Sequence, residues 1–226
     1  MRKGQQDFIT VVSDIDRSVL LEVIDSHQQI DIIEVLMQQP LEVRQAVEEV
    51  SVDMWGGFPK VIAQVYPNAS LVFDRFHVMK AVTQELNKTK AKIGIKDRGS
   101  KYLLLRNQAD LNEQQQQKLA RVLEKSECLR AYQLKEEFRD IYETSKTVKT
   151  GRRKLEKWLK TAPPFYGNSV QTIWNHFDGI CNYFRNRTSS GVMEGMNNRM
   201  KLIMRQGYGF SNFENFRSRL LACLGD

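Results

Sequence analysis

Proline is absent from residues 68–162 of this 226-residue chain, and this gap constrains the fold more than any other feature. Residues 75–160 are rich in Leu, Lys, Gln, Glu and Arg, which favour helices, and hold almost no strand-forming pattern. Because proline interrupts helices, a long stretch without it permits several long ones. The sequence therefore predicts a long helical region, with breaks near Gly94, Gly99 and Gly151 and an end at Pro163-Pro164.

The residues before this region alternate between strand and helix patterns. Runs of β-branched and apolar residues predict strands at 8–12, 19–24, 50–53 and 69–73, the first two joined as a hairpin through a turn at 14–17. Apolar residues at helical spacing predict helices at 30–36 and 58–66, each followed by a proline. Beyond the prolines, helices are expected at 168–184, 191–205 and 212–223. Alternating strands and helices are typical of an α/β layer, so the expected fold class is α/β with a large helical part.

Charge is distributed unevenly along the chain. Residues 1–80 carry a net charge of −5 and residues 81–226 a net charge of +12, and the whole chain carries +7. A basic segment of this size next to an acidic one predicts a polyanionic partner near a carboxylate cluster. A basic helical surface that is simply solvated explains the composition equally well.

Three further properties exclude classes of protein. The chain has no run of 18 apolar residues, so we expect no transmembrane helix and no membrane partner. Its first residues lack the apolar segment of a secretory signal. Cys128, Cys181 and Cys223 are widely spaced and form no C-x-x-C pair, which argues against a zinc site or a disulfide scaffold. We therefore expect an intracellular protein.

Two carboxylates follow predicted strands directly. Asp53 ends the strand at 50–53, where the crevice of an α/β sheet binds ligands, although a turn cap is the more common role of such an aspartate. Asp74 follows the strand at 69–73 and lies three residues before His77, so the two side chains would share one side of a helix start. This pair could hold a metal or orient a phosphate, or it could be an N-cap with a nearby histidine.

The segment around Glu194 combines two stripes at helical spacing. One is apolar and consists of Met193, Met196, Met200 and Ile203. The other is polar and consists of Glu194, Asn198, Lys201 and Arg205. A metal-binding carboxylate beside phosphate-binding side chains would give the second stripe, as would a surface helix with a Glu–Lys pair.

Basic residues gather in two places that suit phosphate contacts. The first is a patch at 146–160 that surrounds Trp158, and a solvated helix is its alternative explanation. In the second, residues 205–217, aromatic and cationic side chains alternate, although Phe213, Phe216 and Leu220 have the spacing of a packed helix that Asn212 would cap. The candidate DNA-binding residues are Lys146, Lys149, Arg152, Arg153, Lys154, Lys157, Asn198, Lys201, Arg205 and Tyr208.

Four motifs follow one another in an order that matches a known family. They are V-S-V-D-M-W at 50–55, P-N-A-S-L-V-F-D-R-F-H-V at 67–78, R-T-S-S-G-V-M-E-G-M-N-N-R-M-K at 187–201 and Y-G-F-S-N-F-E-N-F-R-S-R at 208–219. Together they resemble bacterial insertion-sequence transposases of the ISL3 family, and the resemblance covers nearly the whole chain. Linked motifs in the right order are far more specific than any one of them alone.

The resemblance implies a ribonuclease-H-like mixed sheet with a DDE triad of two aspartates and one glutamate. Asp53 matches the second acid and Glu194 the third, so both would bind Mg²⁺ or Mn²⁺ for phosphoryl transfer on DNA. Asp74 and His77 match an ancillary D-x-x-H motif, and Asp74 as the second acid is the alternative. The implied domains are a partial α/β core at 1–80, a helical insertion at 81–185 and C-terminal helices at 186–226.

The chain departs from the family pattern at its start. The first acid of the family precedes an R-K-G-like stretch, and this chain begins with Met1-Arg2-Lys3-Gly4. We therefore expect the first strand and the first catalytic aspartate to be missing, which would leave an inactive transposase fragment in the bacterial cytoplasm, on the nucleoid. Its expected partners are DNA and either intact transposase or a second copy of itself. The alternatives are a non-catalytic DNA-binding remnant, a structure-specific nuclease of ribonuclease-H-like fold and a helical interaction module.

Overall fold

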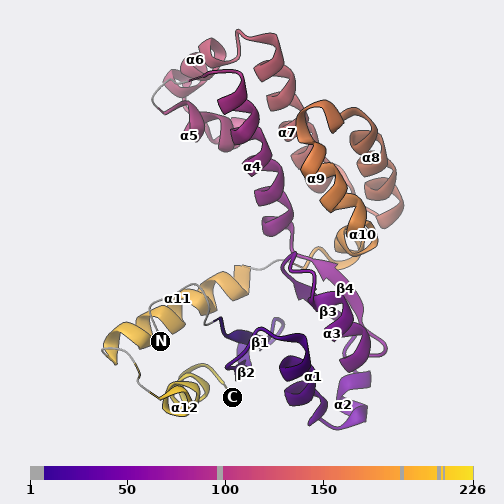
Figure 1. Ribbon diagram of the computed structural model, residues 1–226, viewed down its shortest axis with the longest axis vertical. Helices are drawn as coiled ribbons and strands as arrows, with labels where there is room; N and C mark the ends of the chain where they lie inside the picture. The colour runs from indigo at the N-terminus through magenta and orange to yellow at the C-terminus, as the bar shows by residue number, and fades with distance from the viewer. Residues whose placement is uncertain (1–7, 96–98, 189–190, 208–209, 211, 226) are drawn as a thin grey trace. The chain divides into compact units, whose positions relative to one another are not determined.

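The computed structural model describes residues 8–95, 99–188, 191–207, 210 and 212–225 (Figure 1). The chain folds as two compact units. One combines Met1–Leu71 with Ser189–Asp226 and is called the α/β unit below, and the other is Val72–Thr188, the helical unit. The described fold is mixed α/β and mostly helical, with two small sheets.

The α/β unit begins with the predicted hairpin. Strands β1 (Thr10–Asp14) and β2 (Val19–Ile24) pair antiparallel, with Thr10 opposite Ile24. The register shifts between Val12 and Ser13, which lie opposite Glu22 and Leu20 of β2. Strand β1 therefore begins two residues later than the sequence predicts and continues to Asp14. The turn is held by the side chain of Asp14, which accepts the backbone N–H of Arg17 at 3.0 Å.

The predicted alternation continues after the hairpin. It consists of α1 (Gln29–Met37), α2 (Leu41–Gln45), β3 (Glu49–Val52), α3 (Phe58–Val65) and β4 (Ser70–Phe73). Strands β3 and β4 form the second sheet, and the last two residues of β4 belong to the helical unit. The short helix α2 has no counterpart in the prediction, because its five residues include no buried side chain and so leave no apolar pattern. The unit closes with α11 (Gly191–Gln206) and α12 (Phe213–Leu224).

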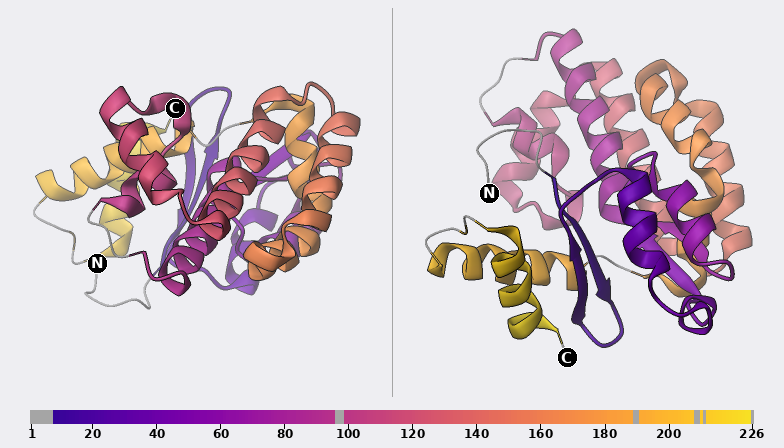
Figure 2. Two further views of the ribbon diagram at one scale, coloured as in Figure 1. Left: turned by 90° about the horizontal axis from the view of Figure 1, so that it is seen from above. Right: turned by 60° about the horizontal axis from the view of Figure 1, so that its bottom comes forward.

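Strand β2 is central to the α/β unit because its two faces belong to different cores (Figure 2). Leu20 and Val23 pack against α11 and α12. Ile24 packs against α1 and α3. On the first side, the apolar stripe of the sequence is confirmed, since Met196 and Met200 are buried and Met193 and Ile203 pack beside them.

The helical unit contains the long helices that the proline-free stretch predicts. Its helices are α4 (Arg75–Lys92), α5 (Ser100–Leu105), α6 (Glu113–Val122), α7 (Ser126–Thr144), α8 (Val148–Thr161), α9 (Pro163–Asn175) and α10 (Phe177–Asn186), with a 3₁₀ turn at Gln108–Asp110. Aromatic side chains fill its core, and two of them donate hydrogen bonds to backbone carbonyl groups of α7. Trp158 donates to the carbonyl of Leu134 at 2.7 Å, and Tyr166 donates to that of Ala131 at 2.6 Å.

Two predicted helix boundaries in this unit need correction, and the first is the break near Gly151, which lies at 145–147 between α7 and α8. Gly151 lies inside α8 and does not break it, because α8 begins with a capping box in which Thr147 and Thr150 exchange hydrogen bonds. The glycine instead allows α10 to approach closely, since a Cβ at this position would lie 2.2 Å from the ring of Phe184. The single helix predicted at 168–184 is two helices, which meet at His176.

The breaks predicted at Gly94 and Gly99 are confirmed, since both glycines have a positive φ between α4 and α5. The break at Pro163 is confirmed as well, and the prolines also open α9, where their fixed φ suits a first helical turn. Among the described residues, no helix is both long and apolar enough to cross a membrane.

Candidate functional site

Asp53 lies directly after β3, where the sequence places it, and its side chain is exposed. Its Oδ1 accepts the backbone N–H of Trp55 at 2.8 Å, which tightens the turn between β3 and α3. The ring of Trp55 covers Gly57, where a Cβ would lie 2.1 Å from the ring, and meets Phe58 edge-on with 5.0 Å between centroids. The turn that carries Asp53 is therefore held in place by the packing of the Trp55 ring.

Asp74 caps helix α4, as one of the two sequence interpretations predicts. Its side chain is 6% exposed and accepts the backbone N–H of Phe76 at 3.0 Å. The Nε2 atom of His77 lies 3.9 Å from Asp74 Oδ2 on the same side of the helix. Both carboxylates accept one backbone N–H, but Asp74 is buried and Asp53 is exposed, so Asp74 is less available for a metal.

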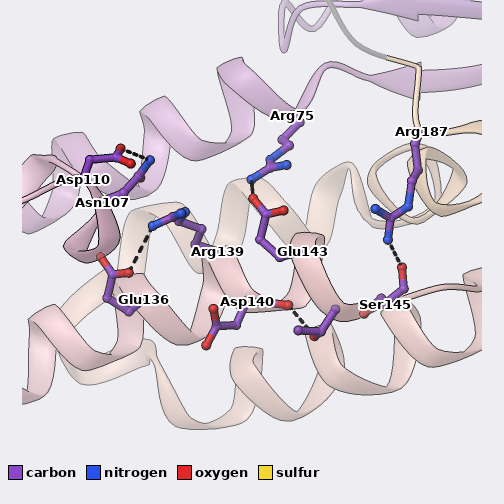
Figure 3. Close-up of polar contacts among 10 residues, drawn as sticks. Arg75, Asn107, Asp110, Glu136, Arg139, Asp140, Glu143, Ser145 and Arg187 are labelled. Atoms are coloured by element: carbon purple, nitrogen blue, oxygen red, sulfur yellow. Dashed lines mark hydrogen bonds and ion pairs between the residues drawn. The ribbon is translucent and has the colours of Figure 1, made fainter.

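Two arginines of the sequence motifs hold the end of α7 (Figure 3). Arg75, in the first turn of α4, pairs with Glu143, and its guanidinium lies 5.3 Å from the ring centre of Tyr142. Arg187, at the end of α10, donates to the carbonyl of Ser145. The Arg75 hydrogen bond lowers the pKa of Glu143 below its ordinary value. Sequence reasoning assigned neither arginine a role, since their partners lie 68 and 42 residues away.

Glu194 lies in the first turn of α11 and is exposed, as are Asn198, Lys201 and Arg205 of the predicted polar stripe. The opposite face of the helix is fixed in the core by Met196 and Met200. Next to Glu194, the sulfur of Met193 accepts a hydrogen bond from Ser13 of β1 at 2.6 Å. The start of α11 therefore lies against the hairpin, and its polar stripe faces away from the core.

A further contact in the α/β unit is one that the sequence does not predict. Arg217 of α12 donates to both carboxylate oxygens of Glu22 in β2, at 2.6 and 2.7 Å. These hydrogen bonds lower the pKa of Glu22. The two residues are 195 positions apart, so no local pattern pairs them. The contact fixes the C-terminal helix on the hairpin that also holds α11.

The predicted basic residues lie on both units. Lys146 precedes α8, and Lys149, Arg152, Arg153 and Lys157 are exposed on that helix, whereas Lys154 is half-buried and donates to Thr144 at 2.8 Å. Asn198, Lys201 and Arg205 lie on α11 in the α/β unit. Tyr208 lies outside the described residues.

A metal site of three or more ligands is not assembled in the described part of the chain, which holds no such group of His, Cys, Asp or Glu side chains. Asp53 and Glu194 are nevertheless the donor type that Mg²⁺ binds, and both are exposed within the α/β unit. Because Mg²⁺ is often held by one or two carboxylates with waters and phosphate oxygens, two acids fit such an ion in a complex with DNA.

Comparisons with known proteins agree with the motifs. The family model described as transposase, of the DDE type and the ISL3 group, matches residues 1–220. The transposase for insertion sequence element IS1001 of Bordetella parapertussis is 26% identical over 201 residues, which cover 82% of this chain and 49% of the relative. The transposase for IS1557 of Mycobacterium tuberculosis is 25% identical over 244 residues, which cover 92% of this chain and 54% of the relative.

The chain thus spans about half the length of the curated relatives that it matches. No solved structure matches it. The family model covers nearly the whole chain, including Asp53, Asp74, His77 and Glu194. This chain belongs to the ISL3 family of DDE transposases.

Proposed function

We propose that this chain is part of a transposase that cuts and joins DNA strands at the ends of an insertion sequence, and that Asp53 and Glu194 are two of its metal-binding acids. The family match supports this proposal most strongly, because it includes both residues. Two exposed carboxylates at the end of β3 and the start of α11 add a physical reason. Bound Mg²⁺ or Mn²⁺ would supply charge neutralisation at the phosphate and a more acidic attacking water or 3′-hydroxyl.

The chain's own residues would hold and orient the DNA around these acids. Lys201 and Arg205 lie on the same exposed face of α11 as Glu194 and would bind phosphates next to the cleaved one. Asn198, between them and Glu194 on that face, would donate to a phosphate or sugar oxygen. The exposed cations of α8 would bind further phosphates of the DNA.

We further propose that the α/β unit belongs to a ribonuclease-H-like core. Its hairpin, followed by alternating helices and short strands, supports this assignment. In this proposal, residues 81–185 are a helical insertion and residues 186–226 return to the core with the third acid. The packing of α11 and α12 on β2, more than 160 residues earlier, agrees with such a return.

The proposal is tested by the metal dependence of DNA binding and cleavage. Mn²⁺ should raise the affinity of the chain for a labelled duplex that carries an insertion-sequence end, and D53N and E194Q should each abolish that gain. The matched variant D74N should keep it, because Asp74 is buried in its helix cap. Loss of the gain in D74N alone would make Asp74 the second acid.

The same samples, run on a denaturing gel, show whether strands are cut. Metal-dependent cleavage that both D53N and E194Q remove supports a working phosphoryl-transfer site. Tight duplex binding with no response to Mn²⁺ would contradict the metal proposal and favour a non-catalytic DNA-binding remnant.

A further inference from the structure

The end of the helical unit where α9 meets α10 presents an exposed aromatic side chain. Of the three tryptophans, all within the described residues, Trp158 is buried, Trp55 is half-buried, and Trp174 on α9 is 44% exposed. An exposed tryptophan is uncommon because its large apolar surface stabilises a protein most when it is buried. Its position therefore needs an explanation beyond packing.

Trp174 forms one end of a row of three flat groups. Its ring lies 5.0 Å from that of the buried Phe177, tilted by 34°. The guanidinium of Arg152, from α8, lies 4.7 Å from the Phe177 ring centre on α10. Asp178 holds that guanidinium at 2.8 Å, so its plane is fixed against the ring. The row joins an aromatic surface on α9 to a cation on α8.

Arg152 is paired with Asp178 and also lies 3.8 Å from Glu156, so further positive charge comes from other residues of the same helix. The first turns of α8 carry Lys149 and Arg153 beside Arg152, and Glu156 is the first acid of the helix. Gln171 lies one turn before Trp174 on α9 and is exposed, with its amide bonded to that of Asn175 at 2.9 Å. Cations, an exposed ring and amides are what a nucleotide with an unstacked base needs.

We propose that this aromatic row binds single-stranded DNA, with an unpaired base stacked on Trp174 and the adjoining phosphates bound by Lys149 and Arg153. Every base has a flat face, so stacking on Trp174 would be tolerant of sequence. Paired bases in a duplex are already stacked and would gain nothing from the ring. This inference rests on the proposed function only in taking DNA as the nucleic acid that is bound. Stacking on Trp174 requires no metal ion.

The test compares single-stranded and duplex DNA in EDTA, with the whole chain and labelled oligonucleotides of about 20 nucleotides. W174A should weaken single-strand binding about ten-fold, or about 1.4 kcal/mol, and should change duplex binding less than about two-fold. W174F should retain most of the affinity, because a phenyl ring still stacks. The matched control is Y102A, which removes another exposed aromatic that lies near an arginine, Arg106, on α5 of the same unit.

Fluorescence gives a second measurement that does not depend on the stability of W174A. Single-stranded DNA should quench the tryptophan emission of the natural chain, and this quenching should disappear in W174F. An equal loss for both DNA forms in W174A, an equal loss in Y102A, or quenching that survives in W174F would each overturn the inference. Because these assays contain no metal, such a failure leaves the proposed roles of Asp53 and Glu194 untouched.

Discussion

Arg217 and Glu22 join the two ends of the α/β unit through a pair of parallel hydrogen bonds, 2.6 and 2.7 Å long, across 195 positions of sequence. Two-pronged contacts between arginine and carboxylate are stronger and more directional than single ion pairs. This contact holds α12 on β2, and β2 also packs against α11, which carries Glu194. The placement of a proposed catalytic acid thus depends on a contact far from it in sequence.

R217A should lower the free energy of unfolding by about 1–2 kcal/mol near neutral pH, because the half-buried Glu22 loses both hydrogen bonds from Arg217 and keeps the one from the backbone N–H of Val23. Arg217 holds the pKa of Glu22 below its ordinary value of 4.5. The contribution is therefore complete above pH 4.5 and is lost as the pH falls through the lowered pKa. Urea unfolding at neutral pH and at about pH 3 measures this, and the difference between R217A and the natural chain should shrink in acid. R219A, an exposed arginine on the same helix, is the control, and an equal loss there would contradict the assignment.

Y142F should leave the stability unchanged or raise it by about 1 kcal/mol. The hydroxyl of Tyr142 is buried and has no hydrogen-bond partner among the described residues, and burial raises its pKa. The matched variant Y166F should instead cost about 1 kcal/mol, because the Tyr166 hydroxyl donates to Ala131 at 2.6 Å. Thermal melts of the two variants check the difference, and equal losses would show that the two hydroxyls are equivalent.

G151A should destabilise the helical unit by about 1–3 kcal/mol, although alanine is the better helix former. The added Cβ would lie 2.2 Å from the ring of Phe184, which is itself buried, so α8 and α10 must separate. G195A is the control, because a Cβ on that residue of α11 meets nothing within 4 Å. It should gain up to about 1 kcal/mol from helix propensity. Chemical denaturation of both variants tests the prediction, and a stabilised G151A would contradict the close approach of the helices.

Replacing Lys149, Arg153 and Lys157 together with alanine should reduce the salt dependence of duplex binding. These exposed cations lie four residues apart on one face of α8, so one duplex can contact all of them. The slope of log affinity against log salt should fall by about 2–3, since each phosphate contact contributes about 0.9. The control is the triple change of Lys101, Lys118 and Arg121, exposed on α5 and α6, which removes the same charge. Equal slopes in the two triple variants would show that only net charge matters.

Local patterns in the sequence predicted local structure well. The period of Met193, Met196, Met200 and Ile203 identified the buried face of α11, because a helix repeats its faces every three to four residues. A helix cap is the expected role of Asn212 and one of two interpretations of Asp74, and both side chains accept backbone N–H groups at the starts of α12 and α4. In each case the interaction involves residues a few positions apart.

Tertiary packing explains what the sequence did not predict. The low helix propensity of glycine predicts a break at Gly151. In the folded chain this glycine instead leaves room for the ring of Phe184 in α10. The break between α9 and α10 lies at His176, and neither this residue nor its two neighbours is a glycine or proline that would predict the end of a helix. The partners of Arg75, Arg187 and Arg217 lie 42 to 195 positions away, and only the folded chain brings them together.

Iron-mediated cleavage of the protein backbone can show whether Asp53 and Glu194 bind one divalent ion together, as we propose. Fe²⁺ substituted for Mg²⁺, with ascorbate and peroxide, cuts the chain where it is bound. A shared ion should give fragments that end near residues 53 and 194, suppressed by excess Mg²⁺ and absent in both D53N and E194Q. Cleavage near only one of the two positions, or cleavage that persists in both variants, would contradict a shared metal site.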